Sequence, residues 1–498
     1  MRALMRSSQK SKAHSAEGGP LQPPRCWLRK PQAAVPAAGG ARLRRLGALL
    51  LLAGAAGAAQ AVDLLDAWRA AQAHDPAFAA AQAARAVGQA QREQGAALWR
   101  PTLQFSAAAG WGANDTAVSG ARFAAPGFGT VDGARFDTSV NGGNLWRWSL
   151  QARQPLLDRE REVGRRQLEL AADGAELQWR DGQQALMLHT VERYFDAALA
   201  AERVRVLERQ QQAVERALAE ARDRHTLGDA PVTDTFEAQA RARAVQAELL
   251  AAQSTLALAR AALADLTGWT PAQAAQLALP DGAAPPPPPP LSEALADARA
   301  GNLRLQLLAT QTEAARQQVA RHAAFASTSV DLVAMAAQDR LAGNGDFGSA
   351  ANAQHNAMVG VQLTVPLYTG GMRSARELEA QRLVDKAAAE AEQQAQQVAQ
   401  ATRAAWYGLT VGASRLQALR AALQATRARL DATRLGREVG DRTTLELLNA
   451  ENDAAAAELA LQQARVALLL DRLRLQLLAG RLDETQLQLA NAGLATPQ

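Results

Sequence analysis

The chain has 498 residues, of which 48% are hydrophobic, 21% are charged and only one is a cysteine. Its formal net charge is +5, but residues 1–61 hold ten of the 54 basic residues and one of the 49 acidic ones, so the remainder has a net charge of −4. The composition therefore argues against nucleic acid as a partner.

Residues 1–61 have the features of a leader and secretory signal peptide. Arginines among residues 42–45 precede an apolar run over residues 46–58, and small residues follow before an expected cleavage point at Val62. A short membrane anchor is the alternative, but 13 apolar residues are too few to span a bilayer. Cleavage would remove Cys26 and leave no thiol, which suits an oxidising compartment.

Two segments of the first half have the alternation of β-strands. One is expected over residues 102–111 and the other over residues 145–155, where apolar residues alternate strictly with polar ones such as Arg147. The Gly-rich segment from Gly112 to Gly143 is expected to be an exposed loop. On the second strand, the residues expected to contact lipid are Trp146, Trp148 and Leu150.

A long helix is expected from about residue 158 to residue 227, because this stretch lacks proline and is rich in Ala, Leu, Gln, Glu and Arg. At 1.5 Å per residue it would be roughly 100 Å long. The chain then turns at Gly228 and returns as a shorter helix to Gly268. Another short helix is expected after Pro76. Helical periodicity alone also allows a solvated coiled-coil hairpin.

The second half repeats the first. Adding 212 to the residue number carries Tyr194 onto Trp406 and Gly228 onto Gly440, as a duplicated unit would. Strands are expected over residues 329–337 and 359–365, and a second long helix over residues 373–439. The lipid-facing residues here are Val359, Val361 and Leu363. The expected organisation is a leader (1–61), a first repeat (62–269), a linker (270–290) that ends in six prolines, a second repeat (291–480) and a tail (481–498).

The strands indicate a barrel shared between chains. After residue 61 no stretch of 18 apolar residues occurs, which excludes a helical membrane span and leaves strands as the means of insertion. Four strands cannot close a barrel, and an open sheet edge is not tolerated in lipid. Two chains would give eight strands and a filled interior, whereas three would give twelve and an open lumen. A soluble hairpin with one wet face is the alternative.

Enzymatic chemistry finds little support. The six histidines are scattered without metal-ligand spacing, and the sequence contains no phosphate-binding loop, no G-x-S-x-G and no HExxH. Neither catalysis nor a cofactor is expected.

The chain carries a series of short motifs in a fixed order: Leu64-Leu65-Asp66-Ala67, Asp75-Pro76, Arg100-Pro101-Thr102-Leu103, Gln154-Pro155-Leu156, Val365-Pro366-Leu367, Tyr368-Thr369-Gly370-Gly371 and the two Gly-Asp turns. In these ordered and duplicated motifs it resembles the TolC family of outer-membrane efflux and secretion ducts over residues 62–480. The resemblance implies a homotrimer with a 12-stranded transmembrane β-barrel, four strands per chain, and a long periplasmic α-helical barrel. It also implies docking to an inner-membrane transporter through a periplasmic adaptor. Thr328 departs from the pattern, since Pro101 stands there in the first copy.

The resemblance also implies a periplasmic gate just past the Gly-Asp turns. Asp234 and Arg442 match the pair that holds the entrance closed, and Glu446 occupies the first position of an acidic ring. Arg437 stands where the family often has a tyrosine, and Asn449 replaces the second acid. The alternative is an ordinary exposed ion pair worth at most about 1 kcal/mol.

The function expected from these features is that of a passive exit duct in a tripartite efflux or type I secretion system. Its cargo would be drugs, small molecules or proteins chosen by the transporter. A periplasmic coiled-coil adaptor or scaffold is the alternative.

Overall fold

The structure is a computed structural model that describes residues 63–229, 231–275, 277–281, 286–323, 328–346 and 348–494. All of them belong to one unit, residues 61–498. The expected leader with Cys26, part of the proline-rich linker and the last residues of the tail lie outside the described residues.

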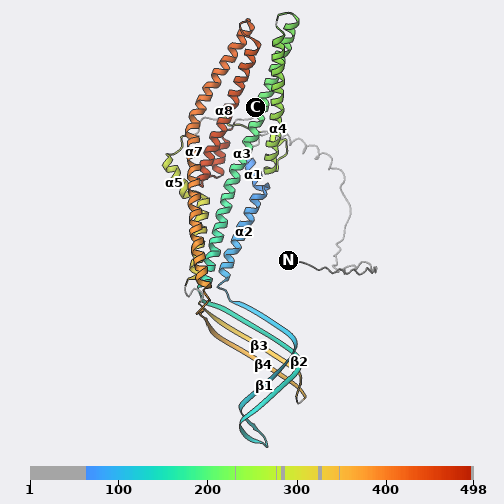
Figure 1. Ribbon diagram of the computed structural model, residues 1–498, viewed down its shortest axis with the longest axis vertical. Coiled ribbons are helices and arrows are strands. Elements are labelled where there is room, and N and C mark those ends of the chain that lie inside the picture. The colour runs from blue at the N-terminus through green and yellow to red at the C-terminus, as the bar shows by residue number, and fades with distance from the viewer. Residues whose placement is uncertain are drawn as a thin grey trace, which may run out of the picture. The chain divides into compact units, whose positions relative to one another are not determined.

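Each half of the chain contributes two short helices, a long helix and a returning helix (Figure 1). The two long helices contain 68 and 67 residues, so each is about 100 Å long. These bounds agree with the long and returning helices expected from the sequence. The helices are α1 (Leu64–His74), α2 (Pro76–Ala97), α3 (Arg159–Thr226) and α4 (Val232–Thr267), then α5 (Leu291–Gly301), α6 (Leu303–His322), α7 (Met372–Glu438) and α8 (Thr444–Leu478), with α9 (Glu484–Asn491) near the C-terminus.

The repeat includes a break between the two short helices, which the sequence analysis missed. The Asp75 carboxylate caps α2 by accepting a hydrogen bond from the backbone N–H of Phe78 at 2.9 Å. Asn302 caps α6 in the same way, from the N–H of Leu305 at 3.1 Å. Both capping residues have extended backbone, so α1 and α5 end where the next helix begins.

Four antiparallel strands form one sheet in the order β1-β2-β3-β4. The expected loop from Gly112 to Gly143 is wrong, because β1 and β2 continue through it and pair as far as Ala125 and Gly129. Its Gly, Ser and Asn content is typical of loops, but bulges let such residues stay in a twisted strand pair. The strands are β1 (Thr102–Ala125), β2 (Gly129–Asp158), β3 (Ser329–Gly345) and β4 (Gly348–Thr364).

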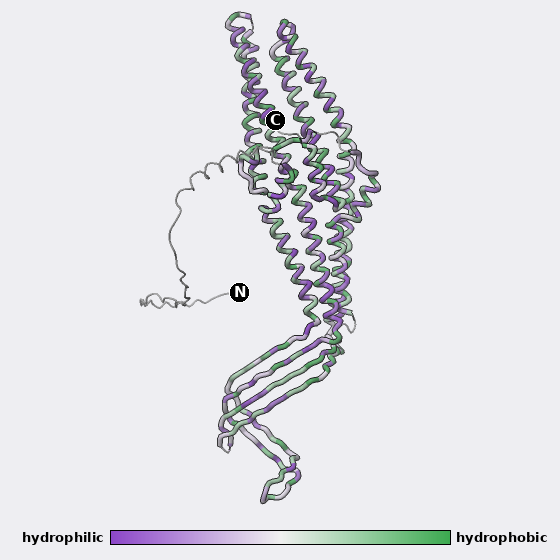
Figure 2. The backbone as a smooth tube through the Cα atoms, turned by 180° about the vertical axis from the view of Figure 1, so that it is seen from behind, coloured by the Kyte–Doolittle hydropathy of each residue, from purple (hydrophilic) through white to green (hydrophobic). Residues whose placement is uncertain are grey.

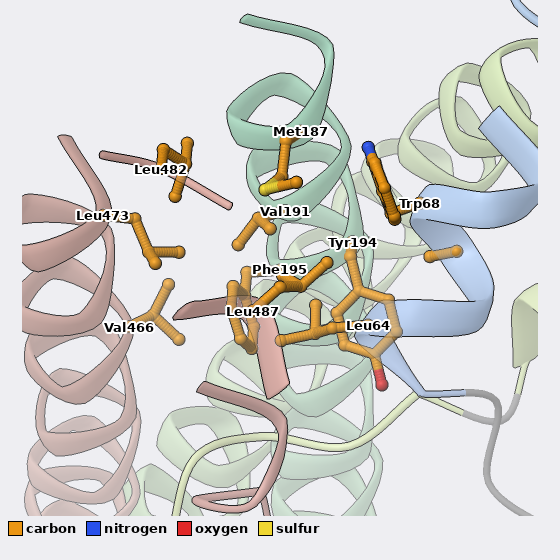
Figure 3. Packing of buried hydrophobic residues seen from close by; sticks show 11 residues of the cluster. Leu64, Trp68, Met187, Val191, Tyr194, Phe195, Val466, Leu473, Leu482 and Leu487 are labelled. Atoms are coloured by element: carbon orange, nitrogen blue, oxygen red, sulfur yellow. The ribbon is translucent and has the colours of Figure 1, made fainter. Parts of the chain in front are cut away.

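The largest hydrophobic cluster ties both ends of the described chain to α3 (Figure 3). The Tyr194 hydroxyl accepts a hydrogen bond from the backbone N–H of Ala278 at 2.9 Å, which joins the linker to this core. Burial raises the pKa of Tyr194 to about 12, so the phenol stays neutral. The cluster includes Leu64 and Trp68 of α1, Met187, Val191, Tyr194 and Phe195 of α3, Val466 and Leu473 of α8, Leu482, and Leu487 of α9.

The helix α4 is long and apolar enough, by length and composition, to cross a membrane, and it is the one such helix in the described part of the chain. The exclusion of every helical span from the sequence was therefore too strict. Instead, α4 packs along α3 as the second arm of a hairpin, with Leu249 and Leu256 buried against Val204 and Leu207.

Two glycines allow α5 and α8 to end in direct backbone contact. A Cβ atom on Gly301 would lie 2.2 Å from the carbonyl oxygen of Ala479, and one on Gly480 would lie 2.1 Å from the carbonyl oxygen of Gly301. Gly480 also has a φ of +67°, which a side chain would strain. The contact fixes the end of the α7/α8 hairpin beside α5.

We expect Gly301→Ala to destabilise the protein by about 1–3 kcal/mol, because the added methyl group would overlap a backbone carbonyl. The measurement is the thermal unfolding midpoint of the detergent-solubilised protein. Gly174→Ala on α3 is the matched control, since its Cβ would lie 3.5 Å from Leu307, an ordinary contact. Equal midpoints for the two variants would contradict a rigid contact at Gly301.

Candidate functional site

One face of the sheet is mainly apolar along the part where all four strands pair, with Gln338, Arg340 and His355 as its polar members toward the Gly142–Asn344 end. Directly opposed residues share a face, and Ala334 pairs with both Ala152 of β2 and Val359 of β4. Phe105 and Trp148 stack on this face with ring centroids 6.5 Å apart. The six residues expected to contact lipid, Trp146, Trp148, Leu150, Val359, Val361 and Leu363, all lie on it and are 37–75% exposed in the single chain.

The opposite face is polar and carries cross-strand ion pairs. Arg147 contacts Asp339 at 2.5 Å, and Arg153 contacts Asp331 at 2.5 Å. Asp331 is fully buried between strands, where its partner offsets the cost of removing the carboxylate from water. Gln362 lies opposite Asp331 on this face. The sheet is therefore amphipathic, with hydrophobic and charged sides.

The outer edges of the sheet are open. In the described chain, β1 pairs only with β2, and β4 pairs only with β3. Each edge therefore presents a row of backbone N–H and C=O groups with no strand beside it.

At the other end of the helices, both hairpins turn through a left-handed glycine. Gly228 and Gly440 have φ values of 82° and 83°. The backbone N–H of Asp229 donates to the Arg224 carbonyl at 2.9 Å, and that of Asp441 donates to the Gly436 carbonyl at 2.8 Å. These bonds satisfy carbonyl groups at the helix ends, so each turn is tight.

Glu446 belongs to the cap of α8. Its carboxylate accepts a hydrogen bond from the backbone N–H of Thr443 at 2.8 Å, while its own N–H donates to the Thr443 hydroxyl at 3.2 Å. Arg442 also donates to Glu446 at 3.0 Å. The Thr443 backbone N–H and then Arg442 hold the pKa of Glu446 below its ordinary value. This capping box could have been found from the Thr-x-x-Glu spacing.

The sequence analysis missed an ion pair between the hairpins. Arg437, in the last turn of α7, contacts Glu220 of α3. Asp234, on the first turn of α4, accepts a hydrogen bond from the Thr233 hydroxyl at 3.5 Å. Within the described chain no ion pair joins Asp234 to Arg442, which pairs with Glu446 instead. Asn449 is exposed on α8. No sequence pattern relates Arg437 to Glu220, because they belong to different repeats.

Further polar contacts join the same hairpins away from the turns. The amide of Gln210 on α3 donates to Asn452 of α8 at 2.7 Å, and Gln210 is only 9% exposed. Arg209 reaches Glu458 at 3.5 Å. The two hairpins of one chain therefore touch through hydrogen bonds and ion pairs as well as through a small hydrophobic cluster of Val214, Val245 and Leu448.

Among the residues that the structure describes, no group of three or more His, Cys, Asp or Glu side chains is placed to hold a metal ion. The candidate site therefore consists of the two faces and edges of the sheet and of the polar residues near the helix turns.

The family described as outer membrane efflux protein matches the chain over residues 67–269 and 294–481. The chain belongs to this family. It is an outer-membrane channel for efflux or type I secretion, as expected from the sequence, and its family is one of transport channels rather than of enzymes. The scaffold alternative is not favoured.

Known relatives cover most of the chain. It is 28% identical to the proteases secretion protein PrtF of Dickeya chrysanthemi, over 89% of this chain and 94% of PrtF. It is also 28% identical to the outer membrane protein TolC of Vibrio cholerae, over 72% of this chain and 82% of TolC. The crystal structure of the Vibrio cholerae outer membrane protein VceC has the same fold, with a TM-score of 0.65 and 19% identity over 84% of this chain and 96% of VceC.

We expect Arg437→Ala to increase single-channel conductance in planar bilayers, because it removes a link between the two hairpins. A single exposed ion pair is worth about 0–1 kcal/mol. A few copies would therefore favour the closed arrangement of the hairpins over the open one without locking it. Arg429→Ala is the matched control, since Arg429 pairs with Asp453 inside the α7/α8 hairpin at 2.5 Å.

The double variant Glu220→Ala and Arg437→Ala should conduct like Arg437→Ala alone if the two side chains act through each other. An additive increase, or the same increase in Arg429→Ala, would show that the contact between hairpins is not what limits conductance.

Proposed function

We propose that three copies of the chain form a continuous exit duct through the outer membrane and periplasm. The observation that carries the proposal is the amphipathic sheet with two open edges. Lipid cannot satisfy the backbone groups of β1 and β4, so each edge needs a strand of a neighbouring chain. Three four-stranded sheets make a 12-stranded barrel with room for a lumen.

In this homotrimer the apolar face contacts outer-membrane lipid and the polar face lines the lumen. The side chains of Trp148 and Val361 then replace contacts with water by contacts with acyl chains. The pairs Arg147–Asp339 and Arg153–Asp331 lie on the water-filled side, where both arginines stay hydrated. The reverse orientation would cost roughly 2–4 kcal/mol for each arginine placed in the hydrocarbon.

The helices extend the duct into the periplasm. Helices α3 and α7 begin at or soon after the strands and run about 100 Å to the glycine turns, so the turns form the periplasmic tip. We assign the gate to this tip, formed by Asp234, Arg437, Arg442, Glu446 and Asn449. Asp234 and Arg442 would meet between neighbouring protomers. Arg437 would act within one protomer, through Glu220.

A duct of this kind needs partners that supply energy and cargo. We assign these roles to an inner-membrane transporter and a periplasmic adaptor that bind the helical end, with no enzymatic step in this chain. PrtF, which matches along nearly its whole length, is named a proteases secretion protein. Its long alignment supports protein secretion as well as efflux, and the transporter would select the cargo.

We expect the detergent-extracted protein to migrate as a trimer whose cross-linked mass equals three mature chains, because open strand edges must be paired. Chemical cross-linking followed by denaturing gel electrophoresis measures this mass, and circular dichroism on the same sample reports the sheet. A stable monomer that keeps its β-sheet signal would contradict the shared barrel.

Neighbouring positions on β4 should differ in their access to water. In a chain without Cys26, a cysteine introduced as Gln362→Cys should react in membranes with a membrane-impermeant maleimide, whereas Val361→Cys should react only after detergent is added. The reason is that adjacent strand residues point to opposite faces. Reaction at position 361 but not at 362 would reverse the assignment of the two faces.

A further inference from the structure

The β1–β2 hairpin continues beyond the four-stranded part of the sheet. The last pairs between β2 and β3 are at Gly142 and Gly143, whereas β1 and β2 pair with each other as far as Ala125 and Gly129. We call residues 113–141 the ribbon. Its register shifts by bulges, and it bends away from the sheet in both views (Figures 1 and 2). Its base touches the end of β3, where Asp346 hydrogen-bonds to Ser139 and Asn141, and beyond this base no strand of the described chain pairs with it.

The ribbon has one apolar face. Phe123 pairs with Val131, and Val118 pairs with Phe136. The rings of Phe123 and Phe136 lie 5.4 Å apart, so these residues share a face. In the single chain Phe123 and Phe136 are 39% and 42% exposed, and Phe128 at the tip is 81% exposed.

The other face of the ribbon is charged. Arg135 contacts Asp137 at 3.0 Å, and these residues flank Phe136 in the sequence. Arg122, next to Phe123, contacts Asp132 at 3.3 Å. Alternate residues of a strand point to opposite sides, so charged side chains lie on one side of the ribbon and aromatic ones on the other.

The apolar face of the ribbon continues the polar face of the sheet. Trp111 lies on the apolar face of the sheet, and Val118 follows it by an odd number of residues. Gly112 pairs with Gly143, and Asn114 pairs with Val140. Between these pairs β1 advances by two residues and β2 by three, so the extra residue of the bulge lies in β2. The alternation along β1 therefore continues unbroken, and Val118 points to the opposite side from Trp111.

We propose that the three ribbons of the homotrimer lean over the outer mouth of the barrel, pack their apolar faces together and form an extracellular constriction. This inference rests on the proposed trimer and its lumen-facing polar face. A two-stranded ribbon is at best marginally stable alone in water. Its apolar face points toward the barrel axis rather than toward lipid. At that axis it faces the other two ribbons of the trimer, which are related to it by the threefold axis.

Cross-linking in membranes tests the arrangement, in a chain without Cys26. Val131→Cys lies on the apolar face near the tip, and its neighbour Asp132→Cys on the charged face is the matched control. Each chain carries one cysteine, so a short bis-maleimide can form one cross-link in each trimer and join two of its three chains. Up to about two thirds of the Val131→Cys chains should therefore appear as dimers. Asp132→Cys should stay monomeric on denaturing gels.

Conductance provides a second readout. The double variant Phe123→Ser and Phe136→Ser should conduct more than the parent protein, whereas Arg122→Ser with Arg135→Ser should leave conductance unchanged. An intact trimer in which neither cysteine cross-links, or in which position 131 reacts only with a lipid-soluble thiol reagent, would overturn the proposal and indicate that lipid covers the ribbon. Absence of the trimer itself would instead refute the proposed duct.

Discussion

The rest of the structure depends on the unpaired backbone groups along the outer edges of β1 and β4. In water such edges would be tolerable, but in lipid each unpaired group costs several kcal/mol. The sheet has a hydrophobic face rich in tryptophan and leucine, and in the proposed duct this face lies in lipid while other chains complete the sheet. Because helices α3 and α7 follow β2 and β4, pairing of strands between chains also decides which helical hairpins become neighbours.

Duplication gives the chain two similar hairpins, but the two halves are not equivalent. The caps at Asp75 and Asn302 and the glycines at both turns preserve the repeat. Two differences carry separate consequences. Strands β1 and β2 extend into a ribbon that β3 and β4 lack, and Arg437 near the second turn reaches across to Glu220 near the first. Asymmetry between the repeats therefore appears at both ends of the duct, where passage can be restricted.

The sequence predicted the periodic parts of the molecule well. The long helices, the four-stranded sheet and the residues on its apolar face follow from repeats of 3.6 and 2.0 residues, which any one segment displays by itself. The ribbon was missed because its Gly, Ser and Asn residues resemble a loop, while its apolar residues are interrupted by bulges. The contact of Arg437 with Glu220 was missed because it depends on how two helices pack, and packing leaves no local pattern.

The tip shows how local structure limits a residue's possible roles. One carboxylate oxygen of Glu446 accepts the Thr443 N–H and the other accepts Arg442, so a cation bound there would compete with both. The lowered pKa means that Glu446 stabilises the cap at any pH above the ordinary value of 4.5 and loses this effect only as the pH falls through the lowered value.

Asn449 adds no charge. An acidic ring built from Glu446 alone is therefore weak, and Arg442 is already partly neutralised before it can meet Asp234. Among the charged residues at the tip, Arg437 has its partner on the other hairpin, which makes it the residue whose loss changes the spacing of the hairpins most directly.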